Sequence, residues 1–383
     1  MYKGSSSNDN YDSIKDERVN TIKLKNMKNI KFAKDSLGIL RELKKRVDRY
    51  FIENNIKKTG NASLYFKTGL MLFLFFSAYT LPYLLSLNIW GILFAASLAV
   101  FSGLGLGMSV MHDANHGVFS ENEKVNKVFG AVLYLLGGNV FNWKKQHNDD
   151  HHMGTNINGE DPDMESQGYL RLSLEQPWKP IHQFQAYYAV AVYACVSLYR
   201  FFAKDFIQMN EYMKKSSLSS GEKKKEQMIL YSTKILYSFF WLALPLVYWK
   251  GPWWYVLVFF ITMHALSSVV MTIVFAVAHL VPKAETLVSE ELQKDPWVVH
   301  QLKTSCNFGT KNRFLRWYMG GLTHQKEHHV FPRISHIHYK DIEIYFRAIC
   351  RKISIPYIEY SGFWKAVAAH FSLLHSLGRK KIN

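Results

Sequence analysis

Histidines occur in three tight groups along this chain, and each group lies at or just beyond the edge of an apolar stretch. The groups read H-D-A-N-H (His112, His116), H-N-D-D-H-H (His147, His151, His152) and Q-K-E-H-H (Gln325, His328, His329). Neutral imidazole is a common nitrogen ligand of iron, copper and zinc. One H-x-x-x-H pair alone is more often an ordinary surface or core feature. Three such groups in one chain predict a redox metal centre.

The spacing within the groups suggests more than one metal ion. In each of the first two groups a pair of histidines lies four residues apart, which places both side chains on one face of a helix. His152 follows His151 directly and is turned from it by about 100°, because a helix has about 3.6 residues per turn. The adjacent pair of the third group repeats this arrangement. Neighbouring histidines that point in different directions serve two ions more naturally than one.

Three other histidines carry different expectations. His279 closes the last long apolar stretch, in F-A-V-A-H-L. Ionisable groups at membrane depth usually have a functional reason, so we expect His279 to be a ligand. The alternative is a histidine that meets water at the interface. His264, fifteen residues earlier, is expected to make a structural hydrogen bond between helices. His324 is either a spare ligand or a surface group.

Acidic side chains close to the histidines are candidates for orienting them, because ligand histidines usually donate their second N–H to a carboxylate or carbonyl. Asp161 and Asp163, in the D-P-D stretch, are the strongest candidates. The alternative for each carboxylate is a helix cap or an ordinary surface residue. The remaining members of this set are Asp113, Asp149, Asp150 and Glu327.

Long apolar stretches predict membrane spans, since a span needs roughly 20 apolar residues to cross the hydrocarbon core. Four stretches meet this requirement, at about 64–87, 89–111, 229–249 and 253–280. Asn88 separates the first two, and Lys250-Gly251-Pro252 turns between the last two, beside a belt of Trp and Tyr residues. The sequence therefore predicts an all-α integral membrane protein. It has two transmembrane helical hairpins, about four spans, and a cytoplasmic helical cap that holds the histidines.

Shorter patterned stretches are harder to place. Two apolar runs, at about 127–140 and 186–203, are near or below spanning length, and we expect interfacial or re-entrant helices there. Residues from about 36 to 56 repeat apolar side chains at helical spacing among lysines and arginines. This pattern fits an amphipathic helix at a membrane surface, and equally a solvated helix packed on the domain.

Basic residues set the expected orientation. The formal net charge is +17, which in a soluble protein would suggest nucleic-acid binding. Here lysines and arginines are nearly absent from the two hairpin turns and gather in the remaining polar segments. By the positive-inside rule, both termini and the histidine groups then face the cytoplasm, and no nucleic-acid partner is expected. The three cysteines form no C-x-x-C pair, so no disulfide framework or thiolate zinc site is expected.

The motifs resemble those of the membrane fatty acid desaturase family, and within it the linoleoyl-CoA desaturase-like, front-end type. The matching stretches are H-D-A-N-H-G-V-F-S, W-K-K-Q-H-N-D-D-H-H-M-G-T-N-I-N-G-E-D-P-D and G-G-L-T-H-Q-K-E-H-H-V-F-P-R-I-S-H-I-H-Y. The resemblance runs from about residue 60 to 350. We expect a membrane desaturase domain at 36–350, after a disordered or basic tail at 1–35 and before a cytoplasmic C-terminal segment at 351–383.

The resemblance implies a di-iron centre that uses O₂ to insert a double bond into a fatty acyl chain, carried as an acyl-CoA or acyl-lipid. Gln325 stands where many desaturases have histidine, as in the front-end group with its Δ5/Δ6-like regiochemistry, and a hydrogen-bonded water could replace the imidazole there. Bacterial relatives also carry this glutamine. One iron would use His151, His279 and His329. The other would use His112, His116, His147, His152 and His328.

Electrons are expected from a separate protein, because the H-P-G-G haem motif of fused cytochrome b5 domains does not occur in the sequence. A basic cytoplasmic surface suits an acidic donor such as ferredoxin, flavodoxin or a cytochrome b5-like protein. The alternative is that the same charge sets topology and binds anionic membrane lipid.

Other functions remain open at this stage. A hydroxylase or other lipid oxygenase on the same scaffold shares the histidine groups. A non-catalytic receptor or a metal transporter is a second class, but a transporter would place its ligands at mid-bilayer. A metal-dependent membrane hydrolase would use fewer histidines together with a carboxylate ligand.

Overall fold

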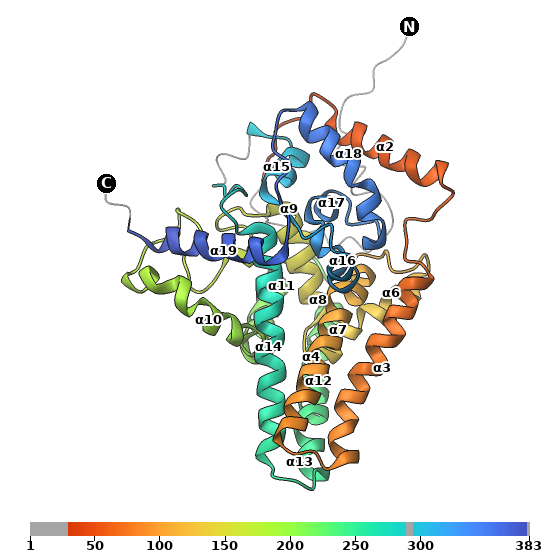
Figure 1. Ribbon diagram of the computed structural model, residues 1–383, viewed down its shortest axis with the longest axis vertical. Helices are drawn as coiled ribbons and strands as arrows, with labels where there is room; N and C mark the ends of the chain where they lie inside the picture. The colour runs from red at the N-terminus through yellow and green to blue at the C-terminus, as the bar shows by residue number, and fades with distance from the viewer. Residues whose placement is uncertain (1–29, 289–293, 381–383) are drawn as a thin grey trace.

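The computed structural model describes residues 30–288 and 294–380, and these residues form a helical stem below a helical cap (Figure 1). The described strands are two residues each, β1 (Asn307–Phe308) and β2 (Glu359–Tyr360), which pair in parallel. The protein is therefore mostly helical, as expected. The disorder predicted for about the first 20 residues, and most of the tail at 1–35, fall outside the described residues.

The first stem hairpin matches the two apolar stretches at its start. Its helices are α3 (Ala62–Leu85) and α4 (Ile89–Gly105). The Asn88 side chain caps α4 by accepting a hydrogen bond from the Gly91 N–H, which fixes the turn between the helices. The second helix continues without a break through η1 (Leu106–Met111) and α5 (His112–Asn115), and so carries the first histidine group out of the stem.

The second stem hairpin begins earlier than expected. Its first arm runs through α12 (Ser220–Ser238), η6 (Phe239–Ala243) and α13 (Leu244–Tyr248), and its second arm is α14 (Trp254–His279). The apolar stretch begins only at about residue 229. A capping box starts the helix nine residues before it, with Ser219 and Glu222 satisfying each other's backbone N–H groups.

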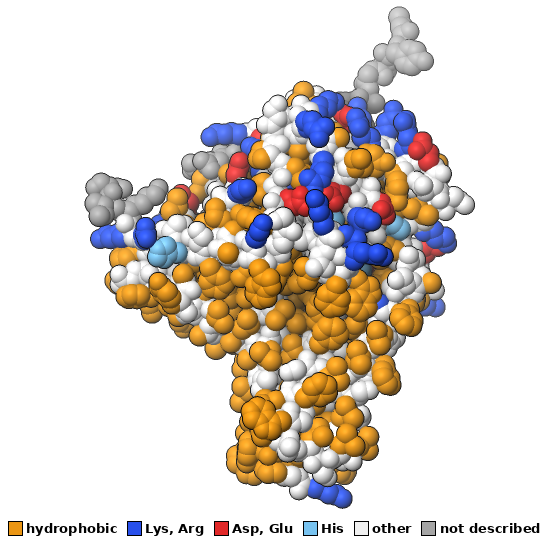
Figure 2. Space-filling view, viewed as in Figure 1, with side chains coloured by type: hydrophobic (Ala, Val, Ile, Leu, Met, Phe, Trp, Pro, Cys, Tyr) orange, Lys and Arg blue, Asp and Glu red, His pale blue; other side chains and the backbone are white. Residues whose placement is uncertain are grey.

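The outside of the stem is apolar. Figure 2 shows a broad hydrophobic surface over the stem, with charged side chains gathered over the cap. Large side chains point outward from it, and Phe66, Trp90 and Val247 are each about three-quarters exposed, at 74%, 75% and 75%. Soluble monomers rarely expose apolar patches of this extent, so the stem is suited to lipid.

A fifth long helix was not expected to reach spanning length. It runs through η4 (Pro180–Phe184), α10 (Gln185–Tyr199), η5 (Arg200–Lys204) and α11 (Asp205–Lys215). By length and composition, five helices among residues 30–288 and 294–380 can cross a membrane, one more than the sequence indicated. In Figure 1, α10 runs obliquely to α14.

The other short apolar run, 127–140, forms no long helix. It is divided among α6 (Glu123–Gly130), α7 (Val132–Leu135) and the start of α8 (Val140–Trp143). The positive φ of Gly137, +78°, turns the chain between α7 and α8. Each of these helices is far below the length of a span, as the sequence indicated.

The N-terminal amphipathic helix packs on the protein. α2 (Ile39–Glu53) buries Leu43, Val47 and Phe51 against α15 (Trp297–Thr304) and α18 (Tyr339–Lys352). It lies in the cap, remote from the stem tip at α13 (Figure 1). The structure therefore shows the alternative of a helix packed on the domain, because its apolar stripe is covered by protein.

The remaining elements complete the cap and its edge. The C-terminal helix α19 (Phe363–Gly378) packs on α10 and α14 and buries Ala366 and Leu374. The other elements are η2 (Lys144–His151), α9 (His152–Gly154), η3 (Pro162–Met164), α16 (Arg313–Met319), η8 (Gly320–Thr323), α17 (Gln325–Val330) and η9 (His336–His338).

Two polar contacts join the inner helices. His264 on α14 lies 2.7 Å from the Ser197 hydroxyl on α10 and 3.0 Å from the Tyr237 hydroxyl on α12. The structural role expected for His264 is thus confirmed. Between α11 and α12, Lys234 donates to Asp205 at 2.6 Å, with both side chains buried, while Arg200 lies further from that carboxylate at 3.8 Å.

Replacing Lys234 with Met should lower the free energy of unfolding by about 3 kcal/mol, because the Asp205 carboxylate would stay buried without its main cation. Chemical denaturation in detergent, followed by tryptophan fluorescence, measures the change. Lys224→Met, at an exposed position of the same helix, should change it by less than about 0.5 kcal/mol. Equal stability of the two variants would contradict a stabilising role for the pair.

Candidate metal centre

Seven histidines from four parts of the chain gather where the stem meets the cap. They form two groups, in each of which one ring nitrogen per residue lies within 4.8 Å of all the others. The tetrad contains His112, His116, His147 and His328. The triad contains His151, His279 and His329. Each group offers enough nitrogen atoms in a small enough volume to hold a metal ion.

His152 lies between the tetrad and the triad. Its Nε2 is 3.3 Å from Nε2 of His147 in the tetrad. Its ring centroid is 4.6 Å from that of His328 and 4.5 Å from that of His329. The structure thus brings together all eight histidines that the sequence singled out as ligands. The two groups are neighbours and not separate sites.

The first histidine group follows a π-helical turn, whereas His147 and His151 of the second group lie within one and His152 follows it. η1 leads into α5, and η2 leads into α9. A π turn is closed by a hydrogen bond to the carbonyl five residues earlier, and the His152 N–H bonds in this way to His147. His152 therefore comes round beside His147, which α-helical spacing would align with His151. The π geometry lets one short segment supply ligand candidates to both groups.

The third histidine group is held by the small sheet. Asn307 on β1 accepts a hydrogen bond from the Lys326 N–H at 3.1 Å and donates to the Glu327 carboxylate at 2.8 Å. The Tyr357 hydroxyl, next to β2, donates to the same carboxylate at 2.8 Å. Burial raises the pKa of Glu327 although these hydrogen bonds oppose the shift. The carboxylate therefore ties α17 to Asn307 and Tyr357, and it is not among the groups that could hold a metal ion.

Most of the histidines are buried in their neutral form, and His151, which pairs with Asp161, is the exception. Burial, reinforced by the mutual repulsion of the rings, lowers the pKa of five of them well below the usual value: His116, His147, His152, His328 and His329. Within the described residues, the buried Nε2 atoms of His116, His151 and His328 have no hydrogen-bond partner. Such atoms need an explanation, and a cation bound among neutral imidazoles supplies it. The donor set fits a metal that accepts nitrogen ligands.

Asp161 orients His151. Nδ1 of His151 donates to both oxygens of this carboxylate, each at 3.1 Å, and the second carboxylate of the D-P-D stretch, Asp163, lies 3.6 Å away. Burial lowers the pKa of His151, but the charge and hydrogen bond of Asp161, with the charge of Asp163, raise it to about 9. These contacts keep a proton on Nδ1 and direct Nε2 to the triad.

The other triad histidines are oriented by groups that the sequence did not indicate. Nδ1 of His329 lies 2.9 Å from the Gln301 side-chain oxygen and 3.2 Å from the Thr155 hydroxyl. His279 donates from Nδ1 to the Thr304 carbonyl at 3.1 Å. Neutral residues far away in the sequence carry no signal for such a role. Only Thr155, four residues after His151, lay close enough to a histidine group to be considered.

The other residues that the sequence singled out near the histidine groups differ in their distance from the centre. Gln325 is buried and its side chain interacts with His279, so it reaches the triad. His324 turns away and lies 3.4 Å from Glu343 on α18. Asp113 accepts hydrogen bonds from Ser335 and His336. The other two carboxylates pair outside the centre, Asp149 with Lys145 and Asp150 with Tyr212.

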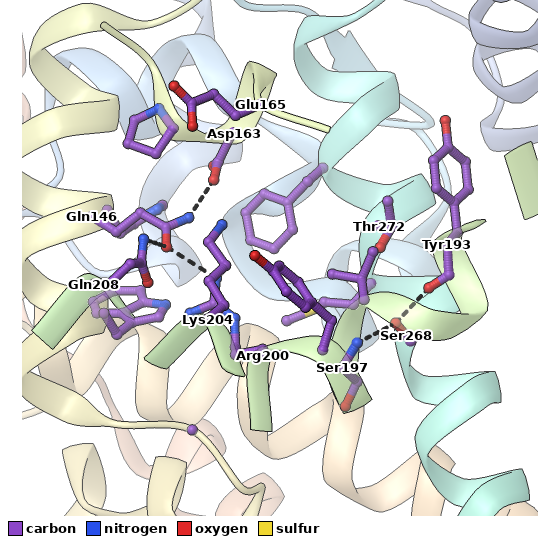
Figure 3. A pocket seen from close by; sticks show the side chains of 18 of the residues that line it. Gln146, Asp163, Glu165, Tyr193, Ser197, Arg200, Lys204, Gln208, Ser268 and Thr272 are labelled. Atoms are coloured by element: carbon purple, nitrogen blue, oxygen red, sulfur yellow. Dashed lines mark hydrogen bonds between the residues drawn. The ribbon is translucent and has the colours of Figure 1, made fainter. Parts of the chain in front are cut away.

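A cavity of about 1380 Å³ opens beside the histidines, and His147, His151 and His279 line it. One end is polar, where Gln146, Asp163, Arg200 and Lys204 lie together (Figure 3). The other end runs between the stem helices and is lined by apolar side chains and glycines, among them Phe75, Ala99, Gly103, Gly107 and Met263. A long molecule with one polar and one apolar end fits this shape.

The sequence is similar to those of known proteins. The family model described as fatty acid desaturase matches residues 87–361. An sn-1 linoleoyl-lipid 6-desaturase of Synechocystis sp. is 31% identical, over 91% of this chain and 98% of the relative. An acyl-lipid (8-3)-desaturase of Physcomitrium patens is 30% identical, over 88% of this chain and 71% of the relative. A Delta(5) fatty acid desaturase A of Dictyostelium discoideum is 25% identical, over 91% of this chain and 76% of the relative.

The matched region contains all three histidine groups and His279, and it includes both stem hairpins except α3. The apolar stem, the buried histidines and the long cavity are consistent with the match to the fatty acid desaturase family. The chain belongs to the fatty acid desaturase family.

Proposed function

We propose that this protein is an acyl-lipid desaturase of the front-end type, which places a new double bond between an existing one and the carboxyl end of a fatty acyl chain. As a fatty acid desaturase the protein is an oxidoreductase. The names of its relatives, a linoleoyl-lipid 6-desaturase and an acyl-lipid (8-3)-desaturase, support the acyl-lipid substrate and the front-end position. The observation that carries the proposal is that both histidine groups adjoin a single cavity with one polar and one apolar end.

The proposed metal centre holds two iron ions. The triad, His151, His279 and His329, would hold one, and the tetrad with His152 would hold the other. Neutral imidazoles and a nearly complete lack of carboxylates among the candidate ligands favour redox chemistry over hydrolysis, which more often uses a carboxylate ligand and a water. Gln325 would contact the triad iron through a water, since its own side chain interacts with His279.

The reaction requires a strong oxidant, because the methylene C–H bonds of an acyl chain lie far from any activating group. Two reduced irons together with O₂ supply that oxidant when bound. Two hydrogens leave from neighbouring methylenes and O₂ is reduced to two waters, a balance that also consumes two electrons and two protons. The electrons come from the separate donor.

The residues of the protein itself position the acyl chain and the ligand histidines, and they protect the reacting carbons from water. The apolar arm of the cavity holds the acyl chain in a defined register and keeps water away from the reacting carbons. Asp161 keeps His151 in one tautomer, and the Thr304 carbonyl does the same for His279. The burial that lowers the pKa of the other histidines keeps them unprotonated and so available as ligands.

We further propose four membrane spans, with the helix from Pro180 to Lys215 lying near the interface. Arg200 and Lys204 fall near the middle of this helix, and a spanning orientation would place both charges at mid-bilayer, which is expensive. Its oblique course relative to α14 also supports this placement. The excess of Lys and Arg over the cap supports a cytoplasmic cap and cytoplasmic termini.

The proposed electron donor is a separate protein of the ferredoxin, flavodoxin or cytochrome b5 type. The basic residues of α2, which include Arg41, Lys44 and Arg49, lie on the cap and would attract an acidic donor. Long-range attraction of this kind raises the association rate and falls with ionic strength.

The proposed function predicts a new double bond in the lipids of a host that expresses the protein and is fed saturated, mono- and di-unsaturated acids. Mass spectrometry of the lipids gives its position. His328→Ala should abolish the product, since it removes a tetrad nitrogen, while His375→Ala, exposed on α19, should leave it unchanged. A hydroxylated product would indicate an oxygenase instead, and a product from His328→Ala would refute the proposed centre.

Asp161→Asn should weaken iron binding about tenfold to a hundredfold, because the loss of a carboxylate partner loosens a ligand histidine by this order. Iron retained by the purified protein against a competing chelator measures the effect. Asp149→Asn removes a carboxylate that pairs with Lys145 outside the centre and should retain iron normally. Identical iron retention in the two variants would show that Asp161 does not support an iron ligand.

A further inference from the structure

The polar end of the cavity lies directly beside the histidines. Arg200 donates to the Gln146 side-chain oxygen at 3.0 Å, and the amide of Gln146 in turn donates to Asp163 at 2.5 Å. Asp163 lies 3.6 Å from Nδ1 of His151. Two side chains therefore separate the guanidinium group from a proposed iron ligand. Figure 3 shows this connected line of residues along one wall of the cavity.

Lys204 lies beside this line of residues, and its ammonium group is available to bind a ligand. Arg200 and Lys204 are the first and last residues of the π-helical turn η5, a geometry often found at functional sites. Within the described residues, the Lys204 ammonium has neither a hydrogen-bond nor an ion-pair partner, whereas Lys234 and Lys145 nearby are both paired. In Figure 3 the Lys204 side chain reaches into the cavity toward the side that carries Asp163.

The apolar arm on the other side of the histidines is long. Ala99 lines the cavity and lies thirteen residues before His112 on the same continuous helix, which is about 20 Å at roughly 1.5 Å per residue. An extended acyl chain advances about 1.3 Å per carbon, given C–C bonds of about 1.5 Å, so this arm takes on the order of 12 to 15 carbons. The reacting carbons then lie much closer to the polar end of the chain than to its methyl end.

We propose that Lys204, assisted by Arg200, binds the carbonyl oxygen at the carboxyl end of the acyl chain and so fixes which carbons meet the metal centre. This inference rests on the proposed function and adds to it the residues that set the position of the double bond. The anchor holds the carboxyl end a few carbons from the histidines, and the apolar arm takes the rest. The two residues position the substrate and do not take part in the chemistry.

The charge of the cavity wall favours one form of the acyl substrate, a glycerolipid ester, over a CoA derivative. Six acidic side chains line the cavity, against three lysines and arginines: Asp150, Glu160, Asp161, Asp163, Glu165 and Glu211. A polyanionic head group such as CoA would be repelled by this surplus of carboxylates. An uncharged ester carbonyl accepts a hydrogen bond from Lys204 without that repulsion. The predicted ligand is therefore the ester of an acyl glycerolipid.

The test uses the full-length protein in lipid-bilayer discs with O₂, an electron donor and glycerolipids that carry acyl chains of about 18 carbons, which fill the apolar arm and leave a few carbons to reach the anchor. Apparent KM and the position of the new double bond are measured together. Lys204→Met should raise KM about tenfold, the effect of losing one hydrogen bond from a charged donor, and should yield double bonds at more than one position. Lys204→Arg should restore a single position.

Lys214→Met serves as the matched control, because Lys214 is exposed on the same helix and does not line the cavity. If Lys204→Met has the same KM and the same double-bond position as this control, the proposed role of Lys204 as the anchor is wrong.

The wild-type protein gives a second test that needs no variant. A glycerolipid with an ether in place of the ester lacks the carbonyl, and it should show the same rise in KM and loss of a single position. An ether lipid processed like the ester also overturns the anchor. Absence of any desaturated ester lipid from the wild-type protein would instead refute the proposed function on which the anchor rests.

Discussion

Eight imidazole rings buried within contact of one another impose the central constraint on this molecule. His279 and His329 each use their single N–H outside the cluster, on the Thr304 carbonyl and the Gln301 side-chain oxygen, so their facing Nε2 atoms are two lone pairs with no proton between them. His112 and His147 bring their Nε2 atoms to 3.2 Å, and His279 and His329 do the same. A cation in each group would remove the conflict, since every ring can then present a lone pair inward. Burial that keeps the rings neutral prepares them for that role.

The rest of the fold serves to bring these rings together from distant parts of the sequence. Of the stem helices, the extension of α4 carries His112, and α14 ends in His279. The stem alone cannot supply the remaining rings, so the cap adds them from η2, α9 and α17. The cap is in turn fixed by small, specific contacts, among them Asn307 and Tyr357 on Glu327. A long apolar stem, suited to lipid, thus ends in a rigid polar layer, and the cavity joins the two environments.

Local patterns in the sequence were sufficient to predict the stem and the identity of the clustered histidines. The hairpins follow from apolar stretches, and the histidine groups are visible as motifs. Three features could not be predicted in this way. The π turn of η2, which brings His152 beside His147, depends on tertiary packing and leaves no periodic signal. Gln301, which contacts His329, is an ordinary residue of α15 that only the fold places there. The apolar stripe of α2 is the same whether its partner is lipid or α18, so the pattern alone did not distinguish them.

The central claim is that two irons lie in one histidine cluster, one in the triad and one in the tetrad with His152. Anomalous X-ray scattering at the iron edge, from crystals of the iron-loaded protein, tests it most directly. The account predicts two separate iron peaks, one within reach of His151, His279 and His329 and the other within reach of His112, His116, His147 and His328. A single peak, or peaks away from these nitrogens, would contradict it.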